Sequence, residues 1–145
     1  MAISISENEI KSLIKKAISA RERAYVPYSN FGVGAALLAK NGKIYEGCNI
    51  ENAAFTPGMC AERTAFSKAV FEGERDFIAI AVVGWKLNAA ENDRGFAFPC
   101  GVCRQVMREF CSPDAFFIIT AVSPEDYKVM SLEELLPNSF GPESL

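Results

Sequence analysis

The order of helical and strand-like segments is the feature that most constrains how this chain can fold. Ser6 begins a capping box, and apolar residues then recur at helical spacing, which predicts a helix over residues 7–25. An Asn-Gly turn typical of hairpins separates expected strands at 31–39 and 43–49. Further helices are expected at 60–73, 99–111 and 131–137, and further strands at 77–85, 115–122 and 127–130. This order predicts an α/β fold in which helices cover both faces of one sheet.

Length and charge narrow the class of protein further. The 145 residues, half of them hydrophobic, suit a single domain over residues 1–145. No apolar run is long enough to cross a membrane, and the N-terminus lacks the features of a secretory signal, so we expect a soluble, cytoplasmic protein. The net charge of −3 disfavours binding to a nucleic acid polymer, because phosphate contacts require a basic surface. Any nucleic-acid-like ligand is therefore expected to be a small monomer.

Cysteine and histidine usage limits the chemistry that the chain can perform. There are five cysteines, an odd number that does not suit a disulfide framework in a cytoplasmic protein. Histidine is absent, which excludes a Ser-His or Cys-His catalytic pair and any histidine-ligated zinc. A transition metal would therefore have to be held by sulfur and carboxylate groups.

Two cysteine motifs stand where helices are expected to begin. Cys100 and Cys103 are three residues apart after Pro99, a residue that suits a first helical position, so both sulfurs can reach one ion. This spacing alone fits a redox pair, a metal pair or chance. Cys60 and Glu62 begin the preceding helix, and they point in different directions around it. The two can serve one centre only if that centre lies beyond the end of the helix.

Together the motifs supply three thiolates and one carboxylate. Three protein ligands leave a fourth tetrahedral position open, as in catalytic zinc sites, where water loses its proton readily and Glu62 could carry that proton. Three thiolates also leave a net charge of −1, which Arg63 and Arg104 could offset by hydrogen bonding, unless they are ordinary solvated arginines. The alternatives are a closed structural zinc site, with Cys48 or Cys111 as fourth ligand, and a metal-free redox protein.

Three segments resemble the motifs of the small homotetrameric cytidine deaminases. They are Asn49-Ile50-Glu51-Asn52-Ala53, Cys60-Ala61-Glu62-Arg63-Thr64-Ala65 and Pro99-Cys100-Gly101-Val102-Cys103-Arg104-Gln105. The resemblance spans nearly the whole chain, from residues 25–31 to residues 133–142. It implies a three-layer α/β/α fold with a central mixed five-stranded sheet. It also implies a homotetramer with shared active sites.

The resemblance assigns roles to individual residues. One Zn²⁺ per subunit would be held by Cys60, Cys100 and Cys103, with Glu62 as proton shuttle. Arg63 and Arg104 would temper the thiolate charge. Asn49 and Glu51 would bind the ribose 3′-hydroxyl, and Phe31 would pack against the nucleoside. Backbone groups near Ala61 would contact the base, and Phe55 and Phe140 would reach a neighbouring subunit's site. Phe55 departs from the family, which often has a tyrosine there.

The implied reaction is the hydrolytic deamination of cytidine and 2′-deoxycytidine to uridine and 2′-deoxyuridine, with release of ammonia in pyrimidine salvage. Zinc-bound hydroxide would act as nucleophile. The nearest alternatives are deaminases acting on blasticidin S, on a nucleotide or on a base within RNA. Glu51 argues for a free nucleoside, because its carboxylate would repel a phosphate placed beside it.

Overall fold

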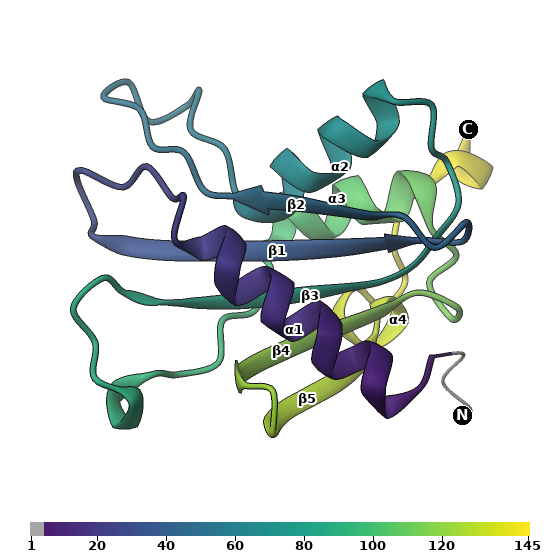
Figure 1. Cartoon of the computed structure of the whole chain (residues 1–145). Helices are drawn as coiled ribbons and strands as arrows, with labels where there is room; N and C mark the ends of the chain where they lie inside the picture. Colours follow the sequence, from purple (N-terminus) through teal and green to yellow (C-terminus); the bar gives the residue numbers. More distant parts are fainter. Residues whose placement is uncertain (1–4) are drawn as a thin grey trace.

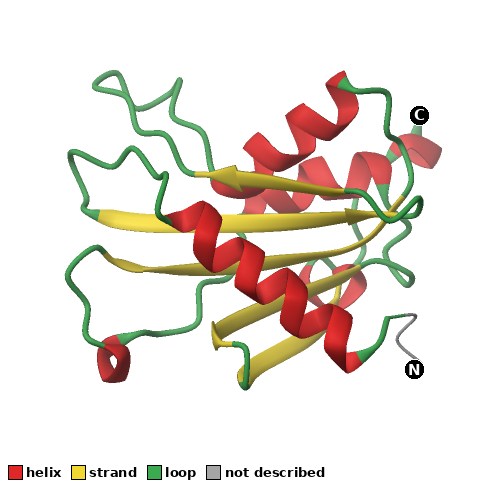
Figure 2. Cartoon of the chain, viewed as in Figure 1, coloured by secondary structure: helices red, strands yellow, loops and turns green. Residues whose placement is uncertain are grey.

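A central five-stranded sheet organises the computed structural model, which describes residues 5–145 (Figures 1 and 2). Strand order is β2-β1-β3-β4-β5. Neighbouring strands are antiparallel except β3 and β4, which are parallel, so the sheet is mixed as the resemblance implied. Residues 1–4 of the expected domain lie outside the described part. The strands are β1 (Phe31–Ala39), β2 (Ile44–Cys48), β3 (Phe77–Lys86), β4 (Phe117–Ser123) and β5 (Asp126–Ser131).

Helices cover both faces of the sheet, which confirms the predicted architecture. Helix α1 (Glu7–Arg21) crosses one face, and α2 (Ala61–Phe71) and α3 (Gly101–Phe110) lie on the other (Figure 1). A core cluster of buried apolar side chains fills each interface, because alternate residues of the central strands point to opposite faces. Helix α4 (Leu132–Leu135) and the 3₁₀ turns Glu91–Asp93 and Pro142–Ser144 complete the fold. No helix among residues 5–145 combines the length and hydrophobicity needed to cross a membrane.

The first helix begins as predicted but ends earlier. Ser6 and Glu9 form the expected capping box, whereas the helix ends at Arg21 and not near residue 25. Tyr25 instead bridges to Ile50, and its amide donates to the carbonyl of Asn49. This tertiary pairing draws residues 22–25 out of the helical pattern.

The two helices that carry the cysteine motifs both begin beside the same end of the sheet. Cys60 is the N-cap of α2 and Cys100 is the N-cap of α3. Pro99 therefore precedes the N-cap and is not the first helical residue, which corrects the predicted start of α3. Gly47 on β2 allows α2 to approach closely, since a Cβ there would lie 2.3 Å from the carbonyl oxygen of Ala61.

Candidate metal centre

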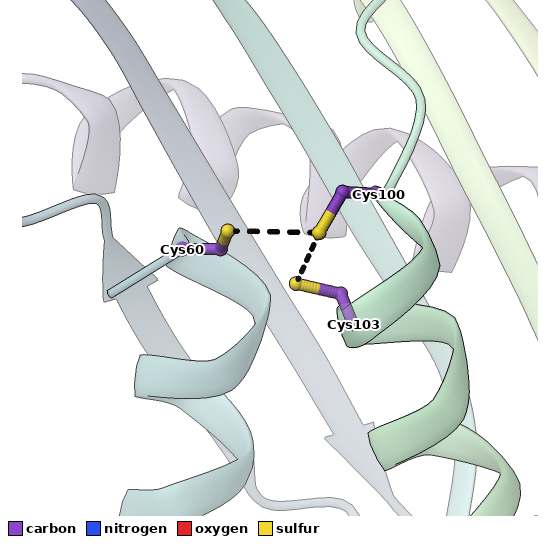
Figure 3. Close-up of side chains that lie close together, drawn as sticks. All are labelled: Cys60, Cys100 and Cys103. Atoms are coloured by element: carbon purple, nitrogen blue, oxygen red, sulfur yellow. Dashed lines mark hydrogen bonds between the residues drawn. The ribbon is translucent and has the colours of Figure 1, made fainter. Parts of the chain in front are cut away.

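Three cysteine sulfurs meet between the N-termini of α2 and α3 (Figure 3). The Sγ atom of Cys60 lies 3.9 Å from that of Cys100, which lies 3.6 Å from that of Cys103. All three sulfurs lie within 4.8 Å of one another. The structure thus brings together the three cysteines that the sequence singled out from two distant segments.

The sulfur spacing fits a tetrahedral zinc ion. A regular tetrahedron with Zn–S bonds of about 2.3 Å places its sulfur atoms about 3.8 Å apart. Among residues 5–145, this is the one group of cysteine, aspartate and glutamate side chains with ligand atoms clustered in this way. Cys48 donates from its sulfur to the carbonyl of Arg23, and Cys111 is buried elsewhere. The centre therefore offers three protein sulfurs, as a catalytic zinc site does, and not the four of a closed structural site.

Helix ends and an arginine stabilise negative charge at this centre. The N-termini of α2 and α3 both favour thiolates. Arg63 donates from Nη2 to the sulfur of Cys60 over 3.3 Å. Hydrogen bonding from Cys103 and then from Arg63 lowers the pKa of Cys60 to about 5, and the pKa of Cys103 is raised because its proton is shared with Cys60. A zinc ion would replace that proton.

Arg104 has a different set of partners from those that the resemblance implied. Its Nε donates to the carbonyl of Pro99 over 2.7 Å, and its Nη1 donates to the carbonyl of Leu135 over 2.6 Å. Both bonds go to carbonyl oxygens, not to sulfur. In this structure Arg104 fixes the backbone immediately before Cys100 and ties α3 to the end of α4.

Glu62 is a buried carboxyl beside the sulfurs. It lies in the first turn of α2, two residues after Cys60, and its side chain is almost inaccessible to water. Burial raises the pKa of Glu62 to about 7. A carboxyl that ionises near neutral pH is suited both to accepting and to donating a proton.

Glu62 and two of the three cysteines open onto a pocket of about 470 Å³. Its lining also includes Asn49 and Glu51, which follow the end of β2. Asn49 accepts from the amide of Val33 over 2.8 Å and donates to the carbonyl of Phe31 over 2.9 Å. One oxygen of Glu51, Oε1, accepts from the amides of residues 28 and 29. Hydrogen bonding with the Ser29 side chain, and then with these two amides, lowers the pKa of Glu51. Both polar side chains are thus oriented by the backbone around the pocket.

The other predicted contact residues are distributed unevenly around this pocket. Phe31, Ala61 and Phe55 line it. Phe55 is strongly exposed, and its φ of 62° lies in the left-handed region. Phe140 is more than half exposed and does not line the pocket of its own chain. The structure therefore gathers every predicted contact residue except Phe140 around one cavity.

Sequence reasoning missed part of the lining. Val33 lies two residues after Phe31 on the same face of β1, so strand alternation could have identified it. Ala97 and Phe98 immediately precede the Pro99-Cys100 motif, and that adjacency was the available signal. Val82 comes from the middle of β3, and nothing in its local sequence marks it as a pocket residue.

Comparisons with known proteins agree with this geometry. Residues 7–119 match the family described as the cytidine and deoxycytidylate deaminase zinc-binding region. The chain is 47% identical over 137 residues to a cytidine deaminase of Sporosarcina psychrophila, covering 94% of this chain and 95% of the relative. It is 50% identical over 133 residues to one of Halalkalibacterium halodurans, covering 92% of this chain and 95% of the relative.

A solved structure shares the fold. The crystal structure of a cytidine deaminase from Burkholderia pseudomallei superimposes with a TM-score of 0.79 at 46% sequence identity, covering 89% of this chain and 97% of that one. The similarity includes the five-stranded mixed sheet, and the family match extends across the segments that carry Cys60, Cys100 and Cys103. The chain therefore belongs to the family of zinc-dependent cytidine deaminases, which are hydrolases.

Proposed function

We propose that this chain deaminates the free nucleosides cytidine and 2′-deoxycytidine to uridine and 2′-deoxyuridine, releasing ammonia, as a step of pyrimidine salvage. One observation carries the proposal. Cys60, Cys100, the buried Glu62 and the polar pair Asn49 and Glu51 all line a single pocket. The chain acts as one domain in the cytoplasm, and its five free cysteines fit a reducing compartment.

Glu62 moves the protons of the reaction. The three thiolates would hold a zinc ion, and the chemistry that this ion would supply is a water of lowered pKa that can act as the hydrolytic nucleophile near neutral pH. Glu62 takes a proton from the water whose oxygen attacks C4 of the base, and it delivers this proton to N3. It then takes the second proton of that water to the amino group on C4, which leaves as ammonia while the C4 carbonyl forms. Its burial beside Cys60 supports this role.

The sugar and the base are held by the rim of the pocket. Glu51 accepts from two backbone amides at Oε1, which orients its carboxylate to accept from the ribose 3′-hydroxyl as well, and Asn49 lines the same pocket. The negative charge of the Glu51 carboxylate would repel a phosphate group placed beside it, which favours nucleosides over nucleotides as substrates. Phe31 packs against the nucleoside, and backbone groups at Ala61 contact the base. Arg63 offsets the charge of the Cys60 thiolate.

The active enzyme is a homotetramer with shared sites and one zinc per subunit. Phe55 and Phe140 support this proposal, because both expose large apolar rings to water. A partner subunit would bury them.

Arg104 supports the metal centre from the backbone side by fixing the Pro99 carbonyl next to Cys100.

The test is a zinc assay combined with absorbance-monitored deamination of cytidine, before and after a strong chelator. We expect one zinc per chain, turnover of cytidine and 2′-deoxycytidine, and loss of activity on chelation that zinc restores. CMP and blasticidin S serve as competing substrates and should be turned over far more slowly. A faster rate on either competitor would replace the proposed substrate, and activity unaffected by metal removal would overturn the mechanism.

A further inference from the structure

The segment between β3 and α3, residues 87–98, runs along an open edge of the sheet. Strand β3 continues to Lys86, whereas β4 pairs only with its residues 79–82. A second cavity, of about 440 Å³, lies between the end of β3 and this segment, and Trp85, Gly95 and Phe96 are among its lining residues. The segment projects beyond the sheet at the end where the pocket loops gather (Figure 1). It is thus not packed continuously onto the strand beneath it.

The end of this segment forms part of the nucleoside pocket. Ala97 and Phe98 line that pocket, and Phe31 lines both cavities. A Cβ built on Gly84 would lie 3.0 Å from both the Cβ of Ala97 and the Cε1 of Phe31. Both side chains therefore lie close over Gly84, so a shift of the segment would change the pocket wall next to Phe31.

Side chains, not backbone hydrogen bonds, hold this wall. Within the described part of the chain, residues 95–98 form no hydrogen bond between backbone groups. The guanidinium carbon of Arg94 lies 4.3 Å from the centre of the Trp85 ring, and the ammonium of Lys128 lies 4.4 Å from that of Phe96. The Nε of Arg94 is buried without a hydrogen-bond partner among the described residues. The contact with Trp85 is therefore the main hold on Arg94.

Trp85 is a fixed platform for Arg94. Its ring is buried, and Arg21 lies 4.8 Å from the ring centre. Arg21 is itself immobilised, because it donates to the carbonyls of Gly32, Trp85 and Lys86. Strand alternation directs Trp85 toward the α1 face and Gly84 toward the pocket face. Arg94 thus holds the segment on one face of the sheet while Ala97 forms the wall on the other.

We propose that Arg94 is a positioning residue for deamination: its contact with Trp85 holds Ala97 and Phe98 in place as a wall of the nucleoside pocket. The inference rests on the proposed function, because the wall matters only if a nucleoside occupies the pocket. Arg94 does not line that pocket and lies outside the sulfur cluster. Its loss is therefore expected to weaken substrate binding and to leave proton transfer by Glu62 intact.

The chain's only tryptophan, Trp85, allows the docking of Arg94 onto its ring to be measured separately from catalysis. The variants are Arg94→Ala, Arg94→Lys, which retains the charge, and Arg75→Ala, a matched control at an exposed arginine beyond α2. Acrylamide quenching and the emission maximum of Trp85 measure this docking without substrate. Steady-state kinetics on cytidine measure, through KM, whether the pocket wall is in place. Zinc content and thermal melting show whether the fold is retained.

We expect Arg94→Ala to increase quenching of Trp85, to shift its emission to longer wavelength and to raise KM by about 5- to 30-fold, the range for loss of a partly desolvated cation–π contact. Its kcat and zinc content should match the wild type, Arg94→Lys should be intermediate, and Arg75→Ala unchanged. Unchanged quenching would overturn the docking role, and increased quenching with an unchanged KM would overturn the positioning role. Failure of the wild type to turn over cytidine would instead overturn the proposed function, and this inference with it.

Discussion

Glu62 combines burial with proximity to the cysteine sulfurs. Among residues 5–145 it is the one buried carboxyl, and removal from water is the largest cause of its raised pKa. An isolated buried charge is costly, so a fold retains such a group only where another interaction offsets the cost. At this site a zinc ion held by Cys60 and the other two cysteines would provide that offset, which agrees with the proposed role of the carboxyl as a proton carrier.

Replacing Glu62 by glutamine tests this role. The amide has nearly the same shape but cannot carry a proton, so we expect kcat/KM for cytidine to fall by about 10²- to 10⁴-fold. Zinc content should be unchanged, because Glu62 is not among the clustered sulfur ligands. Metal analysis and absorbance kinetics measure the two effects. A variant that retains the wild-type rate would exclude Glu62 as the proton shuttle.

Glu51 makes a pH-dependent contribution to the free energy of unfolding, which can be measured by comparing the wild type with a substituted variant. Hydrogen bonds to the Ser29 side chain and to nearby backbone amides lower its folded-state pKa below the ordinary value of 4.5. A depressed carboxyl pKa stabilises the fold above the unfolded-state pKa, and this stabilisation is lost as pH falls through the folded-state pKa. The difference in unfolding free energy between wild type and Glu51→Gln should therefore be constant from pH 7 to about 5 and shrink below about 4.5. Paired urea titrations measure it, and a difference that does not change with pH would contradict the assignment.

At the scale of the elements, the position of α2 against β2 determines where Cys60 and Glu62 lie. Cys60 caps α2 and Glu62 stands in its first turn, so both can serve a centre beyond the helix end. Gly47 makes this possible by leaving room for the helix backbone. The close approach of two backbones is thus part of the construction of the site.

Gly47→Ala should damage the metal centre from a distance. The added Cβ would lie 2.3 Å from the Ala61 carbonyl oxygen and 2.7 Å from the Ala65 amide, so the helix must move. We expect a destabilisation of about 1–3 kcal/mol, typical of overpacking, together with reduced zinc occupancy. Gly95→Ala is the control, because a Cβ there would meet open space. Denaturant unfolding and metal analysis measure both, and equal behaviour of the two variants would refute the argument.

The same elements show where sequence patterns are informative. Hydrophobic periodicity, caps and turn residues predicted the type and order of helices α1 to α4 and of the five strands, because those signals are local. The end of α1 was misplaced because Tyr25 pairs with Ile50, a contact made across the fold. The lack of histidine left sulfur and carboxylate groups as candidate metal ligands, and the family resemblance of two motifs assigned the three cysteines that the structure brings together. The roles of Val82 and Ala97 in the lining depend on tertiary placement, which periodicity does not encode.

At the scale of the whole molecule, Phe55 and Phe140 are predicted contact residues whose side chains a single chain leaves largely exposed. Phe140 is held at its carbonyl, which accepts from the side chain of Gln105 over 3.0 Å, while its ring is 58% exposed. Phe55 is 78% exposed at the edge of the pocket. An exposed ring contributes little to a monomer, whereas in a closed homotetramer the same ring can complete a neighbour's site.

Mixing two defective variants tests whether sites are shared. Glu62→Gln inactivates its own site but still supplies Phe140, whereas Phe140→Ala retains Glu62 but deprives a neighbour. Each homotetramer should be impaired, the second through a raised KM. If subunits are unfolded and refolded together in equal amounts, random assembly gives about a quarter of all sites both an intact Glu62 and a neighbour's Phe140. Activity at low cytidine should then exceed the average of the separately refolded variants, with light scattering to confirm four subunits. Activity equal to that average would mean that Phe140 acts within its own chain or not at all. An inactive Glu62→Gln subunit can restore the missing ring only if that ring is supplied across a subunit boundary.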